Sequence, residues 1–313
     1  MEIAERLVES GAYRDLEEPV VVTSGEFLTP FFVNAEKLCG DPRIDGLLTE
    51  QAENDAAIIE HASALAEGEG GFAEVIGEIA GRVSGLVGRD RPAAVSGGQR
   101  RDWLFSGPVA RRLGLPHVSL YKQTPGQGPD RDRLVVRQAP GALPRSECLR
   151  GWRVVHVVDM ITLASSCCAR DPLTAREVGW IPMLRGQGAA VSDLVAVVSR
   201  RQGGEEALER AGVRVSSCVA IDEPFLRRHS RAPEEAVSYY RDPVAWTRAY
   251  LMSHGAGLLH SYLVEDAKKL PRLLKFARDY RAFLESTGMW EELERVAQER
   301  LGKNLSFLVG GDR

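Results

Sequence analysis

A run of apolar residues, Val154 to Val158, constrains the fold of this chain more than any other segment. Only His156 interrupts the run, and the other four members are β-branched valines. Such a run is typical of a strand that is buried on both faces of a sheet. The sequence therefore predicts a central strand with helices packed on either side of it.

The residues that follow this strand predict a site for an anion. Asp159 comes directly after the run, and small or hydroxylated residues come next: Thr162, Ala164, Ser165 and Ser166. A strand that opens into a turn of small residues can present backbone N–H groups and hydroxyls to an anion. A carboxylate before the turn suits sugar hydroxyls or a hydrated Mg²⁺. The segment favours a phosphorylated sugar, and an ordinary strand-to-loop corner is the alternative.

Charge and composition exclude several classes of protein. The 313 residues allow one large domain or two, with a substantial core. The net charge of −4 provides no global basic field, so we do not expect a nucleic-acid partner, although arginines gather at 100–112 and 227–231. No apolar stretch approaches about 18 residues, so we expect no membrane span. The start of the chain lacks the pattern of a signal peptide.

The cysteines favour a reducing compartment. There are 5, an odd number, and none lies in a CxxC pair. This usage fits a cytoplasmic protein better than a secreted one. The adjacent pair Cys167 and Cys168 is interpreted either as a redox switch or as two small core residues.

Predicted strands and helices alternate along the first part of the chain. We expect strands at 20–23, 31–34, 93–95, 117–121, 154–158, 194–198 and 213–219. We expect helices at 2–10, 45–66, 72–87, 104–113, 173–178 and 204–211. The segment 123–133 is too rich in glycine, proline and charge to be anything but a loop. The alternation predicts an α/β fold with a mainly parallel sheet flanked by helices.

The pattern changes at about residue 233. Residues 234–301 lose the strand pattern and carry apolar positions at three-to-four spacing, which is typical of amphipathic helices. We therefore predict two parts, an α/β domain over 1–232 and a helical C-terminal extension over 233–313. The extension is expected to pack on the sheet domain or on a partner subunit.

Four polar residues from separate segments each end a predicted strand: Ser96, Lys122, Asp159 and Arg200. Ligands of parallel sheets bind at the carboxyl ends of the strands. We therefore expect these side chains to meet at one edge of the sheet.

The segment 154–166 resembles the PRPP-binding motif of the type I phosphoribosyltransferases. That motif has an apolar strand, two acidic residues and a turn with threonine and glycine. Asp159 and Thr162 fit it, whereas Val158 replaces the first acid and Ala164 replaces the glycine. The resemblance implies that Asp159 is catalytic and meets the ribose hydroxyls, directly or through Mg²⁺. It also implies that the turn holds the 5′-phosphate of PRPP with Ile161, Thr162, Leu163, Ala164, Ser165 and Ser166.

Four further segments resemble the orotate branch of this family, in the order expected of it: residues 7–14, 23–38, 118–123 and 195–215. Together with the motif they extend the resemblance over about residues 3–225. The family's mobile loop carries a lysine and a histidine that reach a neighbour's pyrophosphate, and 123–133 has neither. The orotate loop is normally basic, and here it carries Glu26.

The turn at 96–103, SGGQRRDW, resembles the family's pyrophosphate-binding turn with added positive charge. The resemblance implies that Ser96, Gly97 and Gly98 let the backbone approach pyrophosphate, and that Arg100 and Arg101 pair with it. The two arginines would then compensate for the loop that lacks cations. Solvated surface arginines are the alternative.

The remaining candidates are Lys122 and the residues that would contact the base. Lys122 is expected to take a catalytic role at the pyrophosphate, or else to be a plain surface lysine. Phe31, Phe32, Thr162 and Arg200 are expected to contact the base, although paired aromatics also suit a core.

The resemblance implies a cytoplasmic, homodimeric, Mg²⁺-dependent phosphoribosyltransferase of pyrimidine nucleotide biosynthesis. PRPP would be the donor and orotate the favoured base. Two alternatives stay open. One is a regulatory protein that binds PRPP or a nucleotide without turnover, which the missing acid, Ala164 and the loop favour. The other is an enzyme for a different base, which Glu26 favours.

Overall fold

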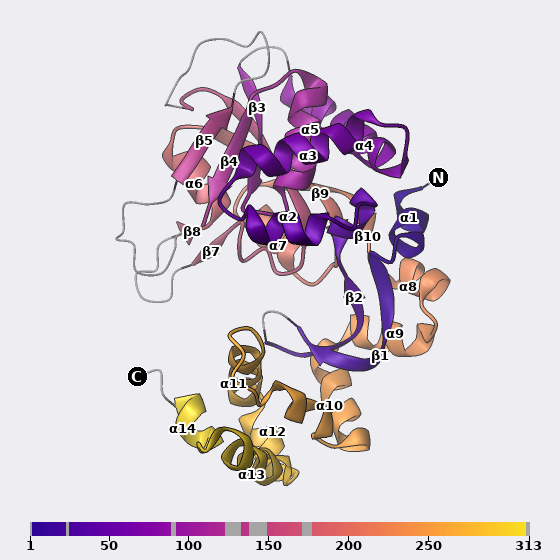
Figure 1. The fold of residues 1–313 in the computed structure, drawn as a ribbon, viewed down its shortest axis with the longest axis vertical. Coiled ribbons are helices and arrows are strands. Elements are labelled where there is room, and N and C mark those ends of the chain that lie inside the picture. Colours follow the sequence, from indigo (N-terminus) through magenta and orange to yellow (C-terminus); the bar gives the residue numbers. More distant parts are fainter. Residues whose placement is uncertain are drawn as a thin grey trace. The chain divides into compact units, whose positions relative to one another are not determined.

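The computed structural model describes residues 2–22, 25–88, 92–122, 133–137, 149–170 and 177–310 (Figure 1). Contacts along the chain define two compact units. The first contains residues 1–13 and 34–222, and the second contains residues 14–33 and 223–313. The boundary at 222 lies close to the predicted division at 232, but the early segment 14–33 groups with the C-terminal helices.

The first unit contains a 6-stranded sheet of order β10-β9-β6-β3-β4-β5. Its strands are β3 (Ala93–Gly98), β4 (His117–Tyr121), β5 (Arg133–Arg137), β6 (Arg153–Ile161), β9 (Ala190–Ser199) and β10 (Arg214–Ala220). All neighbours pair in parallel except β5, which runs antiparallel to β4. The predicted α/β fold with a mainly parallel sheet is confirmed.

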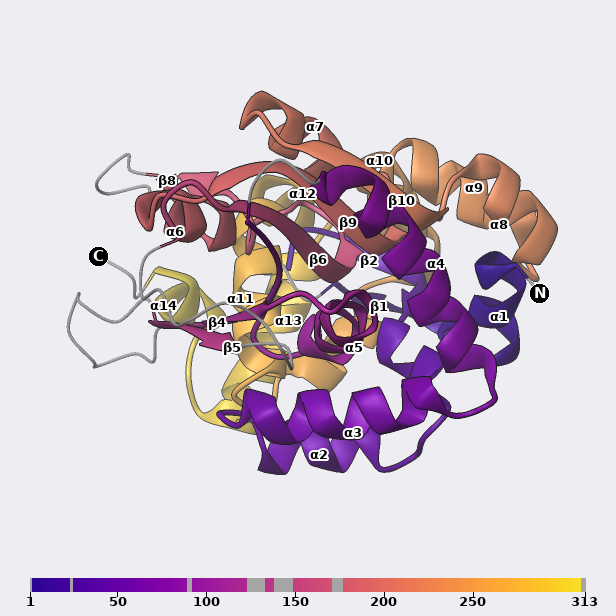
Figure 2. The ribbon, with the colours of Figure 1, turned by 90° about the horizontal axis from the view of Figure 1, so that it is seen from above.

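Helices cover both faces of this sheet. The first unit has α1 (Ile3–Glu9), η1 (Ala35–Cys39), α2 (Ile44–Glu50), α3 (Asp55–Glu67), α4 (Gly71–Val87), α5 (Trp103–Leu113), α6 (Trp180–Gly186) and α7 (Gly204–Arg210). Figure 2 shows α4 and α5 on one side of the sheet, and α6 and α7 on the other. A short strand pair, β7 (Ala169–Arg170) and β8 (Glu177–Val178), lies beside α6.

The valine run forms the middle of the sheet, as predicted. Residues 154–158 are all buried within β6, which pairs with β3 on one edge and β9 on the other. The side chains on both faces of the strand are therefore shielded from water. Burying one such valine contributes about 1.5 kcal/mol or more.

Several elements differ from the sequence prediction for local reasons. The helix predicted over 45–66 is two helices, because the Asn54 side chain accepts the Ala57 N–H (3.2 Å) and starts α3 afresh. The prediction of a helix over 173–178 is wrong for its last two residues, because Glu177–Val178 forms β8. The rest of that segment lies in 171–176, outside the described residues. Most of the loop predicted over 123–133 also lies outside them, and Arg133 already belongs to β5.

The second unit combines a strand pair with helices. Its elements are β1 (Tyr13–Val21), β2 (Leu28–Val33), α8 (Glu223–His229), α9 (Pro233–Arg241), α10 (Pro243–His254), η2 (Gly257–Tyr262), α11 (Lys269–Asp279), α12 (Arg281–Ser286), α13 (Met289–Leu301) and α14 (Leu305–Gly310). The predicted helical character after residue 233 is confirmed, in shorter helices than the pattern indicated.

Long-range hydrogen bonds attach the strand pair to the helices of the second unit. The Val21 N–H donates to the Tyr262 hydroxyl (2.9 Å), and the Leu28 N–H donates to the Thr247 hydroxyl (3.1 Å). These contacts join residues more than two hundred positions apart. They explain why 14–33 groups with the C-terminal helices.

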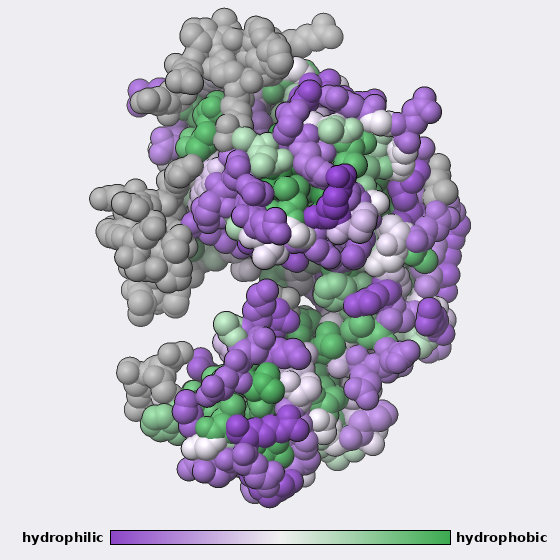
Figure 3. All heavy atoms as spheres, in the orientation of Figure 1, coloured by the Kyte–Doolittle hydropathy of each residue, from purple (hydrophilic) through white to green (hydrophobic). Residues whose placement is uncertain are grey.

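Hydrophilic side chains cover most of the face drawn in Figure 3 and leave hydrophobic ones in smaller patches. Among the described residues, no helix has the length and hydropathy that a bilayer span requires. The cysteines that the structure describes, Cys39, Cys167, Cys168 and Cys218, are free thiols.

A buried histidine in β6 makes the stability of the fold depend on pH. The His156 ring lies 2.9 Å from the Ser96 hydroxyl, and its Nε2 has no hydrogen-bond partner among the described residues. Burial, with a smaller contribution from the charge of His117, lowers the pKa of His156 to about 3. The folded state therefore keeps this imidazole neutral at a pH where the unfolded chain protonates it.

We predict that the free energy of unfolding falls as pH drops below about 6.5, because the unfolded state then binds the extra proton. The contribution of His156 reaches about 1.4 kcal/mol per pH unit. Urea denaturation between about pH 5 and pH 7 measures it. His156→Gln should flatten the slope, whereas His254→Gln, at an exposed position, should leave it unchanged. Equal slopes in wild type and His156→Gln would contradict the prediction.

Candidate active site

The turn after β6 presents a row of backbone N–H groups that have no acceptor among the described residues. Beyond Ile161 the chain leaves the sheet, and the Ala164 carbonyl accepts the N–H groups of Cys167 and Cys168 (both 2.9 Å). Among the described residues, nothing accepts a hydrogen bond from the N–H groups of residues 162–166. Ser165 and Ser166 are exposed, so water or a ligand can reach this end of the turn. We call residues 161–166 the phosphate turn, because such a cluster of N–H groups suits an anion.

The first residue of α7, Gly204, packs against the phosphate turn and is hydrogen-bonded to it. The Gly204 N–H donates to the Thr162 carbonyl (3.1 Å), and the Arg200 N–H donates to the Ile161 carbonyl (2.9 Å). A Cβ at position 204 would lie 2.6 Å from the Thr162 carbonyl oxygen, which is closer than a methyl group can approach. A glycine is therefore required where α7 meets the turn.

Ala164 adopts a backbone conformation that disfavours alanine. Its φ is +57°, in the left-handed region, and its side chain is buried. Glycine occupies this region readily, whereas an L-residue with a Cβ loses about 1 kcal/mol or more there. The position where the resembled motif has glycine is thus one where the local geometry favours glycine.

Asp159 lies half-buried at the carboxyl end of β6. One of its oxygens accepts the Met160 N–H (2.6 Å), and its own N–H donates to the Asp102 carboxylate (2.9 Å). Burial raises the pKa of Asp159, and the positive charge of Arg101 opposes that rise. Burial also raises the pKa of Asp102, and the negative charge of Asp159 adds to it.

The end of β3 is packed too tightly for any side chain. A methyl group at Gly97 would overlap Ser106, and one at Gly98 would overlap the Trp180 ring. The Ser96 hydroxyl is fully buried against His156. The N–H groups of Gly98 and Gln99 already donate to the Asp102 carboxylate (3.0 Å) and the Leu120 carbonyl (2.8 Å).

The next residues carry donors that remain available, and we call residues 99–102 the arginine turn. The peptide bond between Gln99 and Arg100 is cis. Neither Arg100 nor Arg101 donates its N–H to any acceptor in the described parts of the chain. If this corner binds an anion, its donors are therefore in the arginine turn rather than at residues 96–98.

Glu36 fixes one guanidinium in this turn. The Arg101 Nε lies 2.6 Å from the Glu36 carboxylate, which is 5 % exposed, and the Asn34 amide donates to the other Glu36 oxygen (2.6 Å). The Arg101 side chain is 57 % exposed, so the rest of its guanidinium faces solvent. The sequence analysis missed Glu36, whose role depends on a partner 65 positions away.

Lys122 lies at the same edge of the sheet, where its backbone is hydrogen-bonded to the side chain of Gln99. Its backbone N–H donates to the Gln99 side chain (2.8 Å), and the Gln99 amide donates to the Ala52 carbonyl (2.8 Å). The Lys122 side chain is exposed. Gln99 thus connects the end of β4 to the link between α2 and α3.

The structure brings some of the predicted residues together and not others. In the first unit, Asp159 meets the arginine turn where the Asp102 carboxylate accepts the Asp159 N–H. Arg200 is 8 % exposed, and its backbone N–H donates to the phosphate turn.

Phe31 and Phe32 belong to the second unit. Phe31 packs edge-on against Tyr239 (5.3 Å between centroids), and the Arg14 guanidinium lies 5.5 Å from the Phe32 ring. Their contact with a base stays a prediction.

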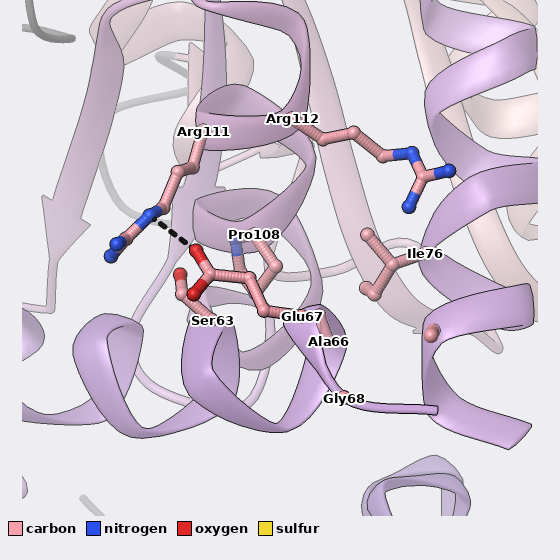
Figure 4. A pocket seen from close by; sticks show the side chains of 9 residues that line it. Ser63, Ala66, Glu67, Gly68, Ile76, Pro108, Arg111 and Arg112 are labelled. Carbon is pink, nitrogen blue, oxygen red and sulfur yellow. Dashed lines mark ion pairs between the residues drawn. The ribbon is translucent and has the colours of Figure 1, made fainter. Parts of the chain in front are cut away.

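A separate hollow of about 290 Å³ lies between α3, α4 and α5 (Figure 4). It is lined by Ser63, Ala66, Glu67, Gly68, Ala73, Ile76, Pro108, Arg111 and Arg112. Arg111 pairs with Glu67 at 2.9 Å. The hollow is at the C-terminal end of α5, whereas the arginine turn precedes the N-terminal end, so the two are distinct.

The donor set suits a weakly held Mg²⁺ rather than a dedicated metal cage. Within the described ranges, no three His, Cys, Asp or Glu side chains converge on a possible metal position. Mg²⁺ commonly binds through one or two carboxylates and completes its shell with water and substrate phosphate oxygens. Asp159 places one half-buried carboxylate at this edge of the sheet, which fits that mode.

Comparison with known proteins confirms the predicted resemblance. No family model matches the chain. The orotate phosphoribosyltransferase of Methanocella arvoryzae (strain DSM 22066 / NBRC 105507 / MRE50) is 33 % identical over 112 residues. These residues are 36 % of this chain and 52 % of the relative, so the similarity spans about half the relative's length.

Two solved structures show weaker likeness. The orotate phosphoribosyltransferase of Aeropyrum pernix has a TM-score of 0.47 at 21 % identity, over 72 % of this chain and 97 % of that one. The UMP synthase of Leishmania donovani has a TM-score of 0.43 at 16 % identity, over 80 % of this chain and 42 % of that one.

We predict that Ala164→Gly stabilises the protein by up to about 1 kcal/mol, because it relieves the left-handed backbone conformation. The matched control is Ala80→Gly, a buried position inside α4, which should lose about 1 kcal/mol. Urea denaturation of the three proteins compares the two signs. Destabilisation by both substitutions would mean that the turn does not have this conformation in solution.

Proposed function

We propose that the first unit binds PRPP and transfers its ribose 5-phosphate to a nucleobase, with release of pyrophosphate. The observation that carries the proposal is the phosphate turn, whose N–H groups follow Asp159 at the carboxyl end of the central strand and have no acceptor among the described residues. The similarity to an orotate phosphoribosyltransferase supports the class of reaction and favours orotate as the base.

The phosphate turn would hold the 5′-phosphate. A phosphate dianion accepts several hydrogen bonds, and the N–H groups of residues 162–166 offer them from a fixed backbone. The hydroxyls of Thr162 and Ser165 add two donors. The Asp159 carboxylate would accept hydrogen bonds from the ribose hydroxyls, which fixes the orientation of the sugar.

The arginine turn would stabilise the leaving group. In the transfer the bond between the sugar carbon and pyrophosphate breaks, the electron pair goes to pyrophosphate, and the base nitrogen bonds to the cation-like sugar carbon. Arg100, Arg101 and Lys122 would stabilise the charge on the leaving oxygens. Because Glu36 already holds Arg101, this guanidinium needs little reorganisation as the charge develops. Mg²⁺, held by Asp159 directly or through water, would neutralise further charge on the pyrophosphate.

The base contacts complete the proposal. Thr162 and Arg200, in the first unit, would bind the base. Glu26, which would disfavour a carboxylate substrate, lies 3.7 Å from the Lys275 ammonium, so part of its charge is neutralised within the second unit. Orotate therefore remains the favoured base, and a different base is the alternative. A homodimer, a cytoplasmic location and a role in pyrimidine nucleotide synthesis belong to the same proposal.

A second candidate function is a regulatory protein that binds PRPP without turnover. The observation that favours it is Ala164 at φ +57°, a local cost in the phosphate turn that an efficient enzyme would avoid with glycine. Val158 at the position of the first acid points the same way.

We predict that the protein with Mg²⁺, PRPP and orotate consumes orotate, measured by its absorbance. Asp159→Asn should lower kcat/KM by at least about 100-fold, because the sugar loses its charged anchor. Asp193→Asn is the matched control: Asp193 is 2 % exposed, and it lies in β9 far from the carboxyl end of that strand.

The possible outcomes separate the candidates. Heat protection by PRPP without loss of orotate or another base would favour the regulatory protein. A wild-type protein that PRPP neither binds nor stabilises would contradict both candidates.

A further inference from the structure

We propose that Asp102 is a positioning residue that holds the arginine turn and the phosphate turn in register, so that one ligand can occupy both. This inference rests on the proposed function for the identity of that ligand. The two hydrogen bonds that the Asp102 carboxylate accepts, which we call the bridge, depend only on the structure of the protein.

The two oxygens of Asp102 serve two different segments. One accepts the Gly98 N–H at 3.0 Å, and the other accepts the Asp159 N–H at 2.9 Å. The residue is 8 % exposed, so neither bond is made in open water. A single side chain thus connects the end of β3 to the end of β6.

Asp102 does this instead of capping its own helix. It occupies the N-cap position of α5, where an aspartate normally accepts an N–H group from the first turn of the helix. Here the Asp102 side chain makes no such bond. The carboxylate therefore accepts from Gly98, four positions earlier, and from Asp159, 57 positions later, which a purely local helix cap would not do.

Tight packing holds the bridge in place. A Cβ at Gly98 would lie 2.9 Å from the Asp102 carboxylate and would also overlap the Trp180 ring. The Trp103 indole donates to the Gly97 carbonyl at 3.0 Å. The end of β3 can therefore move little relative to Asp102.

The bridge also places a second carboxyl group beside Asp159. The sequence has Val158 where the resembled motif has its first acid. Asp102 brings an acid to this region from another element, within hydrogen-bond distance of the Asp159 backbone. We infer that Asp102 takes over the alignment of the sugar-binding end of β6.

The consequence is specific to ligands that contact both turns. PRPP carries a 5′-phosphate and a pyrophosphate on one sugar, so its affinity depends on the spacing of the turns. Ribose 5-phosphate or inorganic pyrophosphate needs only one of them. If the two turns are misaligned, PRPP cannot contact both at once and its affinity falls. Each turn can still bind its own fragment, ribose 5-phosphate or pyrophosphate.

The test compares Asp102→Asn with Asp193→Asn by isothermal titration with PRPP, ribose 5-phosphate and inorganic pyrophosphate, each with Mg²⁺. Asparagine keeps the shape of Asp102 but offers one acceptor oxygen, so one of the two bonds is lost. We expect the Kd for PRPP to rise by at least about tenfold, and the Kd for each fragment by less than about threefold. Asp193→Asn should change none of them. An equal loss for all three ligands, or no loss for PRPP, would overturn the proposal.

Amide hydrogen exchange without ligand tests the bridge independently. In Asp102→Asn the amide of Gly98 or of Asp159, whichever loses its acceptor, should exchange faster, and in Asp193→Asn neither should change. If wild type binds no PRPP, the proposed function fails and this measurement still decides the bridge. Unchanged exchange at both amides in Asp102→Asn would overturn it. If Asp102→Asn does not fold, Asp102→Ser is used, since a serine can cap α5 and cannot span both turns.

Discussion

Strand β6 pairs with β9 as far as Ile161, whereas its pairing with β3 ends at His156 and the Asp159 N–H donates to the Asp102 side chain instead. Just beyond Ile161 the chain leaves the ladder, and the N–H groups of residues 162–166 have no acceptor in the described part of the protein. Backbone donors of this kind require water or a ligand. The whole candidate site depends on this end of the central strand, where the pairing with neighbouring strands stops.

The surrounding residues keep that end in a fixed geometry. Gly204 packs against the phosphate turn from the start of α7, and Asp102 connects the end of β6 to the end of β3. Glu36 orients Arg101 at the other side of the site. Each of these residues acts on a backbone or a guanidinium rather than on a ligand directly. The site is therefore built mainly by positioning, which is what a reaction that depends on orientation and charge stabilisation needs.

Local patterns in the sequence predicted the parts of the structure that local physics decides. The valine run gave β6, and Gly114 ends α5 with a left-handed φ of +63°, as expected of a C-cap. The roles of Asp102 and Glu36 depend on partners 57 and 65 positions away, which no local pattern indicates. Asp102 even has the sequence signature of a helix cap. The grouping of 14–33 with the C-terminal helices depends on contacts such as Val21 with Tyr262, which are equally invisible in the sequence.

The most direct test of the central claim is to record the amide resonances of ¹⁵N-labelled protein during titration with ribose 5-phosphate, with ribose as the control. A phosphate held by the turn should shift the amide protons of residues 162–166 strongly downfield and leave them unaffected by ribose. Shifts confined to other segments, or equal shifts with both sugars, would show that these N–H groups do not bind a phosphate, and the account of the site would be wrong.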